Sequence, residues 1–164
     1  MRRPALILGN CLPHGMPSWM LITHNAFEIL ITPGRVTLLG EVDGNRMRRI
    51  YTDGRPHPED PDLTLHGHSI GRWEGDDFVV ETNGLNDKIW MDTNGHPITE
   101  AAHITERFRR HDYGHMDIQI TIDDPKAYTK PWTITENPSL LADTELLESV
   151  CEENNKDARH IVGK

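Results

Sequence analysis

Apolar and polar residues alternate along most of this chain, and Gly, Pro, Asn or Asp interrupts the alternation at intervals. Because successive side chains of a β-strand point to opposite faces, this period of two predicts strands that each bury one face. The pattern predicts about nine strands, at residues 27–32, 35–42, 45–53, 68–73, 78–83, 103–112, 115–123, 130–137 and 144–153. No stretch has the spacing of a long amphipathic helix, so we expect an all-β fold.

Short turns predict that strands adjacent in the sequence pair in an antiparallel way. Turn-forming residues occur at Pro33-Gly34, 42–45, 74–77 and Tyr113-Gly114. The last two predicted strands would form a closing pair. A sheet of consecutive hairpins must hide its edges, so we expect a closed antiparallel up-and-down β-barrel of the lipocalin or calycin type. The alternative is a jelly roll of the cupin kind.

The length of 164 residues predicts a single barrel domain over 1–164, with an N-terminal extension at 1–24. Residues 54–65 and 84–102 are long and polar, and loops of this length in a compact domain are often lids over a pocket. The apolar content of 36% and mean hydropathy of -0.59 are low for a tightly filled globule. A barrel with a partly polar pocket would have this composition.

The formal net charge of -9 argues against nucleic acid and anionic membranes as partners, because both would repel the protein. No apolar run reaches the roughly 18 residues needed to span a bilayer. We therefore expect a small organic ligand as partner, and self-association into a homo-oligomer is compatible with the sequence. Pro4 interrupts the short apolar stretch at the start, which does not read as a secretory signal, and the compartment stays open. Cys11 and Cys151 would form either one disulfide or two buried thiols.

Four phrases of the sequence, RRIYTDGRPHP, GHSIGRWEGDDFVVET, ITERFRR and DPKAYTKPW, occur in this order. Together they resemble a family of uncharacterised bacterial proteins, many of them apparently exported, and the resemblance extends from about Cys11 to Asn155. It implies no reaction, because no activity is established for that family. Export of its members would favour a disulfide between Cys11 and Cys151.

The pair His66 and His68 is the first candidate for chemistry. Residues i and i+2 of a strand point to the same face, so two neutral imidazoles could chelate one transition metal ion, as in cupins. Glu74 is the candidate carboxylate ligand, with Glu81 and His103 as further candidates. A cupin carboxylate, however, follows on the same strand, whereas Glu74 lies in a predicted turn.

Acid–base catalysis without a cofactor is the alternative that we favour. Histidine titrates near neutral pH, and three of the ten histidines have a suggestive context: His68 and His103 each begin a predicted strand, and His57 lies in a predicted loop. We expect His68, His103, Tyr51 and Asp87 to meet at one barrel mouth, where they would supply a base, acids and an orienting carboxylate.

Charged and aromatic residues on the predicted strands and loops indicate how a ligand would be held. Glu106 would pair with Arg49 or Arg72 inside the barrel, where an arginine could bind a carboxylate or enolate. The alternative is that the pair of Glu106 with an arginine is a salt bridge with a structural role only. Trp90 in the 84–102 loop and Trp132 are the apolar candidates for ligand contacts.

Several motifs are missing from the sequence: GxSxG, a Walker loop, a dinucleotide-binding glycine motif, CxxC and HExxH. Their absence disfavours serine hydrolysis, nucleotide chemistry and dithiol exchange. Three hypotheses remain. The first is a cofactor-independent lyase, isomerase or hydrolase that uses proton transfer, the second is a lipocalin-like binder of hydrophobic ligands, and the third is a metal-dependent, cupin-like enzyme.

Overall fold

The fold was analysed in a computed structural model that describes residues 13–21, 26–42, 46–88, 90–92 and 94–148. The described elements are the helix α1 (Ser18–Leu21) and the strands β1 (Phe27–Thr32), β2 (Arg35–Gly40), β3 (Met47–Tyr51), β4 (His68–Glu74), β5 (Asp77–Asn83), β6 (His103–Arg110), β7 (Met116–Asp123) and β8 (Trp132–Glu136). The strands form one eight-stranded sheet in chain order. The predicted all-β class is confirmed.

Neighbouring strands pair in an antiparallel way, as the turns predicted, except at one step. β3 and β4 run parallel, and their ladder joins only Ile50 to Ser69 and Tyr51 to Ile70. Parallel strands need a crossover connection, which here is residues 52–67. The expectation of a purely up-and-down order is therefore wrong at this step. The single sheet also differs from the two sheets of a jelly roll.

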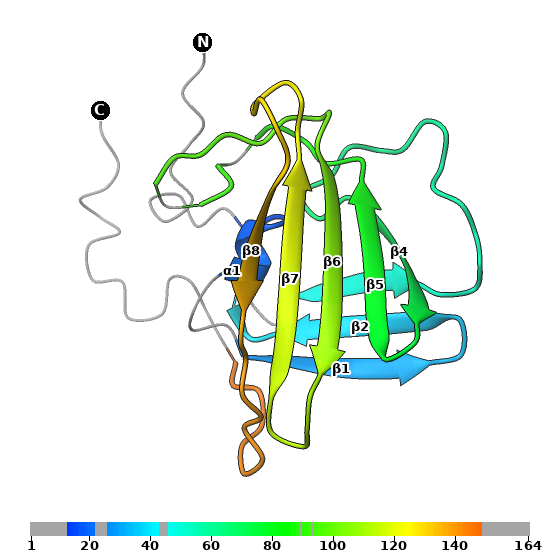
Figure 1. The fold of residues 1–164 in the computed structure, drawn as a ribbon, viewed down its shortest axis with the longest axis vertical. Helices are drawn as coiled ribbons and strands as arrows, with labels where there is room; N and C mark the ends of the chain where they lie inside the picture. Colours follow the sequence, from blue (N-terminus) through cyan, green and yellow to red (C-terminus); the bar gives the residue numbers. More distant parts are fainter. Residues whose placement is uncertain (1–12, 22–25, 43–45, 89, 93, 149–164) are drawn as a thin grey trace.

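The sheet is a curled half-barrel rather than a closed cylinder. Figure 1 shows β1 and β2 running crosswise to β5–β8, so that the two parts of the sheet face each other. In the described part of the chain β1 pairs only with β2, and β8 only with β7. Residues 144–148 of the predicted ninth strand are not in a strand, and 149–153 lie outside the described residues. Within the described residues, two sheet edges are therefore unpaired.

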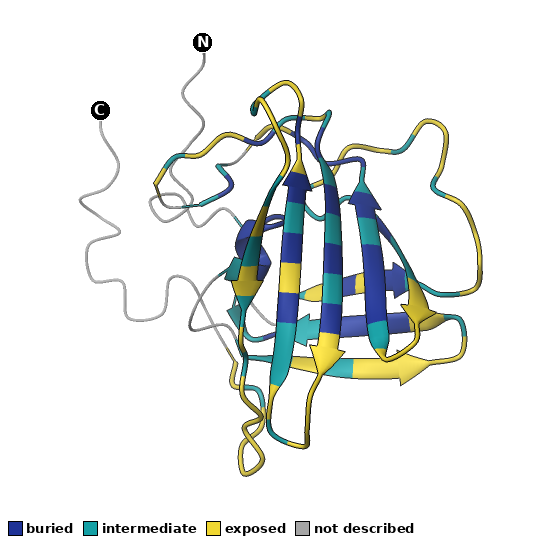
Figure 2. Cartoon of the chain, viewed as in Figure 1, coloured by how far each residue is buried: buried dark blue, intermediate teal, exposed yellow. Residues whose placement is uncertain are grey.

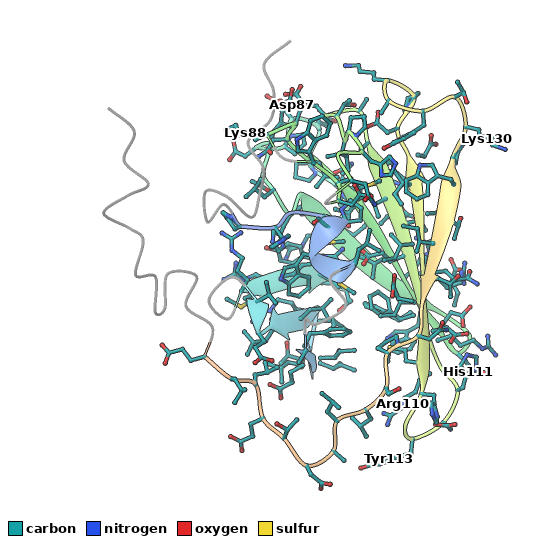
Figure 3. All side chains as sticks on the ribbon, turned by 90° about the vertical axis from the view of Figure 1, so that its left-hand side faces the viewer. Asp87, Lys88, Arg110, His111, Tyr113 and Lys130 are labelled. Atoms are coloured by element: carbon teal, nitrogen blue, oxygen red, sulfur yellow. The ribbon has the colours of Figure 1, made fainter. Side chains whose placement is uncertain are left out.

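The described part of the predicted N-terminal extension, residues 13–21, belongs to the core. Trp19 is fully buried, and Met16 and Met20 are buried beside it in the same apolar cluster. The backbone N–H of Met16 donates a hydrogen bond to the carbonyl of Leu65 at 2.8 Å. Figures 1 and 3 place α1 between the crosswise strands and β6–β8. Residues 13–21 thus fill part of the space over the concave face.

The concave face carries the core, as the alternation of the strands predicted. Ile118, Ile120 and Ile122 of β7 are all buried in it, and the alternating buried bands along β7 are visible in Figure 2. Val36, Leu38, Ile50, Phe78, Val80, Ile104 and Phe108 of the other strands belong to the same cluster. Burial of such side chains contributes about 1.5–3 kcal/mol each relative to exposure.

The two predicted loops, 54–65 and 84–102, are joined by backbone hydrogen bonds at one end of the sheet. The N–H of Thr64 donates to the carbonyl of Gly84, and the N–H of Asn86 donates to the carbonyl of Thr64, both at 3.0 Å. In the second loop Leu85, Met91, Ile98 and Ala102 are buried in the core cluster. This loop also meets the carboxylate of buried Asp124, to which Thr99 donates its backbone N–H at 2.7 Å and its hydroxyl at 2.8 Å. The 84–102 loop therefore covers one end of the core.

Cys11 and Cys151 lie outside the described residues, as does most of the predicted turn at 42–45, so the pairing of the cysteines stays a prediction. Over the described ranges, no helix has the length and apolar character needed to cross a membrane.

Gly67 and Gly75 offer a matched test of the connection before β4. Both have positive φ, 65° and 63°, but a Cβ on Gly67 would lie 2.4 Å from the carbonyl oxygen of Asn83, whereas at Gly75 it would meet nothing within 4 Å. We expect Gly75→Ala to lower the free energy of unfolding by about 1–2 kcal/mol, the cost of a left-handed alanine. Gly67→Ala should cost more, because the backbone of β5 must also move. Urea denaturation measures both, and equal losses would contradict this account of Gly67.

Candidate functional site

Polar side chains gather on both faces of the sheet, and the cluster on the concave face is buried. Arg48 of β3 reaches Glu106 of β6, with its Nη1 donating to Oε1 at 2.8 Å and its Nη2 bonded to Oε2. Its Nη2 also donates to the hydroxyls of Ser69 and Thr82, at 3.1 and 2.9 Å. All four side chains are buried, and Glu106 is fully so. A buried charge needs such a partner and further hydrogen bonds.

Glu106 therefore has an internal partner, as the sequence predicted, but the partner is neither Arg49 nor Arg72. Side chains of β3 alternate, so Arg48 lies on the concave face with Ile50, and Arg49 is exposed on the other face. Arg72 lies on the convex face, where its Nε donates to Glu74 at 2.8 Å and its Nη1 to Glu81 at 2.7 Å. Because Glu106 bonds to protein groups in a closed network, its predicted role in ligand binding has no support from its contacts.

The cluster on the convex face holds two of the four residues that the sequence predicted as catalytic, Tyr51 and His68. His68, the first residue of β4, stacks on Tyr51, the last of β3, with ring centroids 5.3 Å apart and an interplanar angle of 21°. The Nδ1 atoms of His68 and His57 are 2.9 Å apart, a hydrogen-bonding distance. The guanidinium of Arg55 lies 4.0 Å from the ring centroid of Tyr51, and Asp53 accepts hydrogen bonds from that guanidinium. We call Tyr51, Asp53, Arg55, His57 and His68 the histidine-pair site.

The parallel step explains why these residues meet. It places the end of β3 beside the start of β4, so Tyr51 and His68 become neighbours on the convex face. The connection 52–67 then supplies Asp53, Arg55 and His57 from a single loop. Packing of Pro61 on Gly84 and the bond from Thr64 to Gly84 hold that loop against the end of β5. A topological irregularity in the sheet thus creates the site.

Burial shifts both histidines toward the neutral form. The pKa of His57 is lowered from its ordinary value of 6.5, first by desolvation, then by the charges of His68 and His103, while Glu81 opposes the shift. The pKa of His68 is lowered by desolvation and next by the positive charge of Arg55. The lowered pKa values favour the neutral form of both imidazoles, in which one Nδ1 carries the hydrogen that the other accepts.

Two polar atoms beside this pair have no hydrogen-bonding partner in the described part of the chain. They are Nε2 of His57 and Oδ1 of Asn83, and both atoms are buried. Asn83 pairs with His68 in the β4–β5 ladder, so the two orphan atoms lie in the same region of the convex face. Buried polar atoms are nearly always satisfied, so these two atoms set this region of the convex face apart.

The structure brings together some of the predicted catalytic residues and not others. Tyr51 and His68 are in contact, and half-buried His103 lies near enough for its charge to act on His57. Asp87 is exposed on the loop after β5, and Figure 3 shows it at an outer end of the molecule; none of the described contacts joins it to the pair. The carboxylate that the structure does place in the histidine-pair site is that of Asp53, which binds Arg55.

The predicted aromatic ligand contacts do not join the histidine-pair site. Trp132 of β8 is half-buried and packs edge-on against Tyr128, with centroids 5.6 Å apart. Its register with Ile122 places it on the concave face. Trp90 is half-buried in the 84–102 loop. The predicted substrate-binding residues are therefore divided between the two faces of the sheet.

The predicted metal ligands His66, His68 and Glu74 point to different partners. Gly67 adopts a positive φ before the strand begins, so His66 and His68 do not share a strand face. The Nε2 of His66 lies 3.2 Å from the carbonyl of His14. Glu74 is at the far end of β4, about 20 Å from His68 for a strand of this length, and binds Arg72 and Arg107. Among the described residues no group of three or more His, Cys, Asp or Glu side chains could hold a metal ion.

The chain matches no known family model, no curated protein and no solved structure. The interpretation of the site therefore depends on its geometry alone.

The sequence indicates His57 as a candidate but not its contact with His68. It does not indicate Arg48, Asp53, Arg55 or Asn83 as residues of either polar cluster. The alternation of β3 could have identified Arg48. Arg48 and Ile50 are two residues apart and so share a face of the strand, and an isoleucine indicates that this face is buried. Nothing in the local sequence marked the loop residues, since their place depends on the parallel pairing of β3 and β4.

We predict that Glu106→Gln, which leaves Arg48 buried without its counter-charge, lowers the free energy of unfolding by about 3–5 kcal/mol. The double variant Arg48→Met with Glu106→Leu should recover most of that loss, because neither buried charge then remains. Asp76→Asn, which removes an exposed carboxylate 3.9 Å from Arg109, is the control and should cost under about 1 kcal/mol. Chemical denaturation measures all three, and a Glu106→Gln protein as stable as the wild type would disprove this role.

We predict that acid destabilises the fold through His57 and His68. Their folded pKa values lie below 6.5, so the unfolded chain binds protons at a higher pH than the folded chain does. The stability they contribute is fully present above about pH 6.5 and is lost as the pH falls from there through the lowered values. NMR titration of the ring protons should give two midpoints below 6.5, and Arg55→Gln should raise the midpoint of His68. Midpoints at or above 6.5 would contradict the prediction.

Proposed function

We propose that the protein is a cofactor-independent acid–base enzyme of the isomerase type, and that His57 and His68 move a proton between two atoms of a small organic substrate. The observation that carries the proposal is the 2.9 Å separation of their Nδ1 atoms in a half-buried site. The proposed site lies on the convex face of the half-barrel, at the parallel step, rather than inside a barrel.

The hydrogen bond between the two rings makes their outer nitrogens complementary. A neutral imidazole has one N–H, so the ring that donates through Nδ1 has a bare Nε2, which is a base. The ring that accepts at Nδ1 carries its hydrogen on Nε2, which is an acid. The pair therefore presents one base and one acid at the same time, whichever ring is the donor.

The proton transfer balances without a cofactor. The bare Nε2 takes a proton from one substrate atom, the Nδ1 hydrogen of that ring passes to Nδ1 of the other ring, and the second Nε2 gives its proton to a different substrate atom. The substrate is isomerised, and the pair ends with the two tautomers exchanged. Both rings stay neutral, which their lowered pKa values favour.

The surroundings support such a role. In this proposal the orphan Nε2 of His57 would exchange the proton with a substrate that enters the site, and Oδ1 of Asn83 would accept a hydrogen bond from it. Tyr51 stacks on His68, and Arg55, held by Asp53, lies over the ring of Tyr51. The site thus suits a small molecule with an acidic hydrogen near a basic atom, such as an enolisable carbonyl compound.

A lipocalin-like carrier is the second candidate. It is favoured by one observation, the buried Nε1 of Trp132 on the concave face, which has no hydrogen-bonding partner in the described part of the chain. A ligand in the open half-barrel would meet this donor. Met16, Trp19 and Met20 already occupy much of that face, and the histidine pair has no part in such a carrier, so we rank it below the enzyme.

The test is the interconversion of the enol and keto forms of phenylpyruvate, a simple enolisable probe, followed by ultraviolet absorbance. We expect His57→Gln and His68→Gln each to lower the protein-dependent rate by about 100-fold or more, the usual loss for a general acid or base. His111→Gln is the matched control: His111 is exposed, bonds to Asp117 at 2.7 Å and lies at the other end of the molecule from Asp87 (Figure 3). Rates that none of the three substitutions changes would refute the proposal.

A further inference from the structure

The first strand of the sheet has an unusual exposed edge. β1 pairs with β2 along its whole length and with no other strand among the described residues. It contains no proline or lysine, residues that commonly protect sheet edges, and its only charge is Glu28. Figure 2 shows it exposed over most of its length.

Two large apolar side chains on β1 are exposed on opposite faces of the sheet. Ile31 is 67% exposed and shares the concave face with Phe27 and Ile29, whereas Leu30 is 41% exposed and points to the convex face. A partner that lies flat on either face would cover only one of them. A strand added to the edge extends both faces and covers both.

The backbone of β1 determines how such a strand would bind. In an antiparallel ladder alternate residues bond to each neighbour. The N–H of Glu41 donates to the carbonyl of Ala26, so even-numbered residues in this register bond to β2. The N–H and C=O groups of Phe27, Ile29 and Ile31 therefore point to the free edge.

We propose that β1 is a homodimer interface, at which β1 of a second copy adds to the sheet in an antiparallel way around a two-fold axis at Ile29. In this register Ile29 lies opposite itself and Phe27 lies opposite Ile31, so all the free N–H and C=O groups of the edge pair. The apolar side chains of the concave face lie opposite one another, and on the convex face Glu28 lies opposite Leu30.

Neighbouring registers are worse. A shift by two residues in one direction places the two Glu28 carboxylates opposite each other, where like charges repel. A shift in the other direction places Phe27 opposite Pro33, which has no N–H to donate. The edge is therefore self-complementary in one register, which favours a second copy of this chain over an unrelated strand.

Sedimentation velocity of the full chain over a range of concentrations tests the interface. We expect a reversible monomer–dimer equilibrium, and we expect Ile31→Lys, which puts a charge on the edge, to raise the dissociation constant at least about tenfold. Leu141→Lys is the matched control: Leu141 is 62% exposed but lies after β8, so its dissociation constant should equal that of the wild type. A wild-type chain that stays monomeric at every concentration, or an Ile31→Lys chain that dimerises like the wild type, would overturn the proposal.

Disulfide trapping tests the register in a chain that also carries Cys11→Ser and Cys151→Ser. Glu28 and Leu30 of the second copy form a non-hydrogen-bonded pair, the closer of the two antiparallel pairings and suited to a disulfide. Mixed Glu28→Cys and Leu30→Cys chains should form a covalent dimer, and neither chain should do so alone. A covalent dimer of the Leu30→Cys chain alone, or none in the mixture, would overturn the register.

Discussion

The ion pair between Arg48 and Glu106 is the constraint on which the arrangement of the sheet depends. It joins β3, in the crosswise part, to β6, in the part that faces it, and Ser69 and Thr82 complete its hydrogen bonds from β4 and β5. Four strands therefore contribute one polar group each to a cluster inside an otherwise apolar core. An apolar core alone would tolerate several relative positions of the two parts, whereas a buried charge tolerates only those that keep its partner in place.

The two faces of the sheet have separate roles. The concave face buries the apolar side chains and the ion pair, and Trp19 fills the space between the facing strands. The convex face carries exposed ion pairs, such as those of Arg107 with Glu74 and Asp77, and the histidine-pair site near the end covered by the loops. This separation lets the site hold two imidazoles with lowered pKa values without placing further ionisable groups in the core.

The sequence predicted well what depends on local alternation and turn chemistry. The strands from β1 to β8, their hairpins and the buried face of β7 follow from the period of two, and so does the internal position of Glu106. It failed where the outcome depended on contacts between distant residues. The local sequence of residues 52–67 does not show whether they form a lid or the crossover that makes β3 and β4 parallel. That crossover brings His57 and Arg55 to the site.

The candidate site shows the same limit. The sequence predicts that Tyr51 and His68 meet at a barrel mouth, and they do meet, but on the outer surface of the sheet. The i, i+2 argument for His66 and His68 failed because the left-handed conformation of Gly67 interrupts the strand geometry on which it relied. Arg48 rather than Arg49 reaches Glu106 because Arg48 lies on the same face of β3 as buried Ile50.

The parallel joint also has a dynamic consequence. In the backbone ladder only two residue pairs join β1–β3 to β4–β8, so this ladder is the shortest in the sheet, and the side-chain bonds of Arg48 are a second polar link across it. Proteins open in cooperative units whose borders lie where few hydrogen bonds cross, and hydrogen exchange reports these openings. We expect the two groups of hairpins to behave as separate foldons. Since Tyr51 and His68 lie on opposite sides of this joint, an opening there would unstack them and open the surroundings of the buried nitrogen of His57.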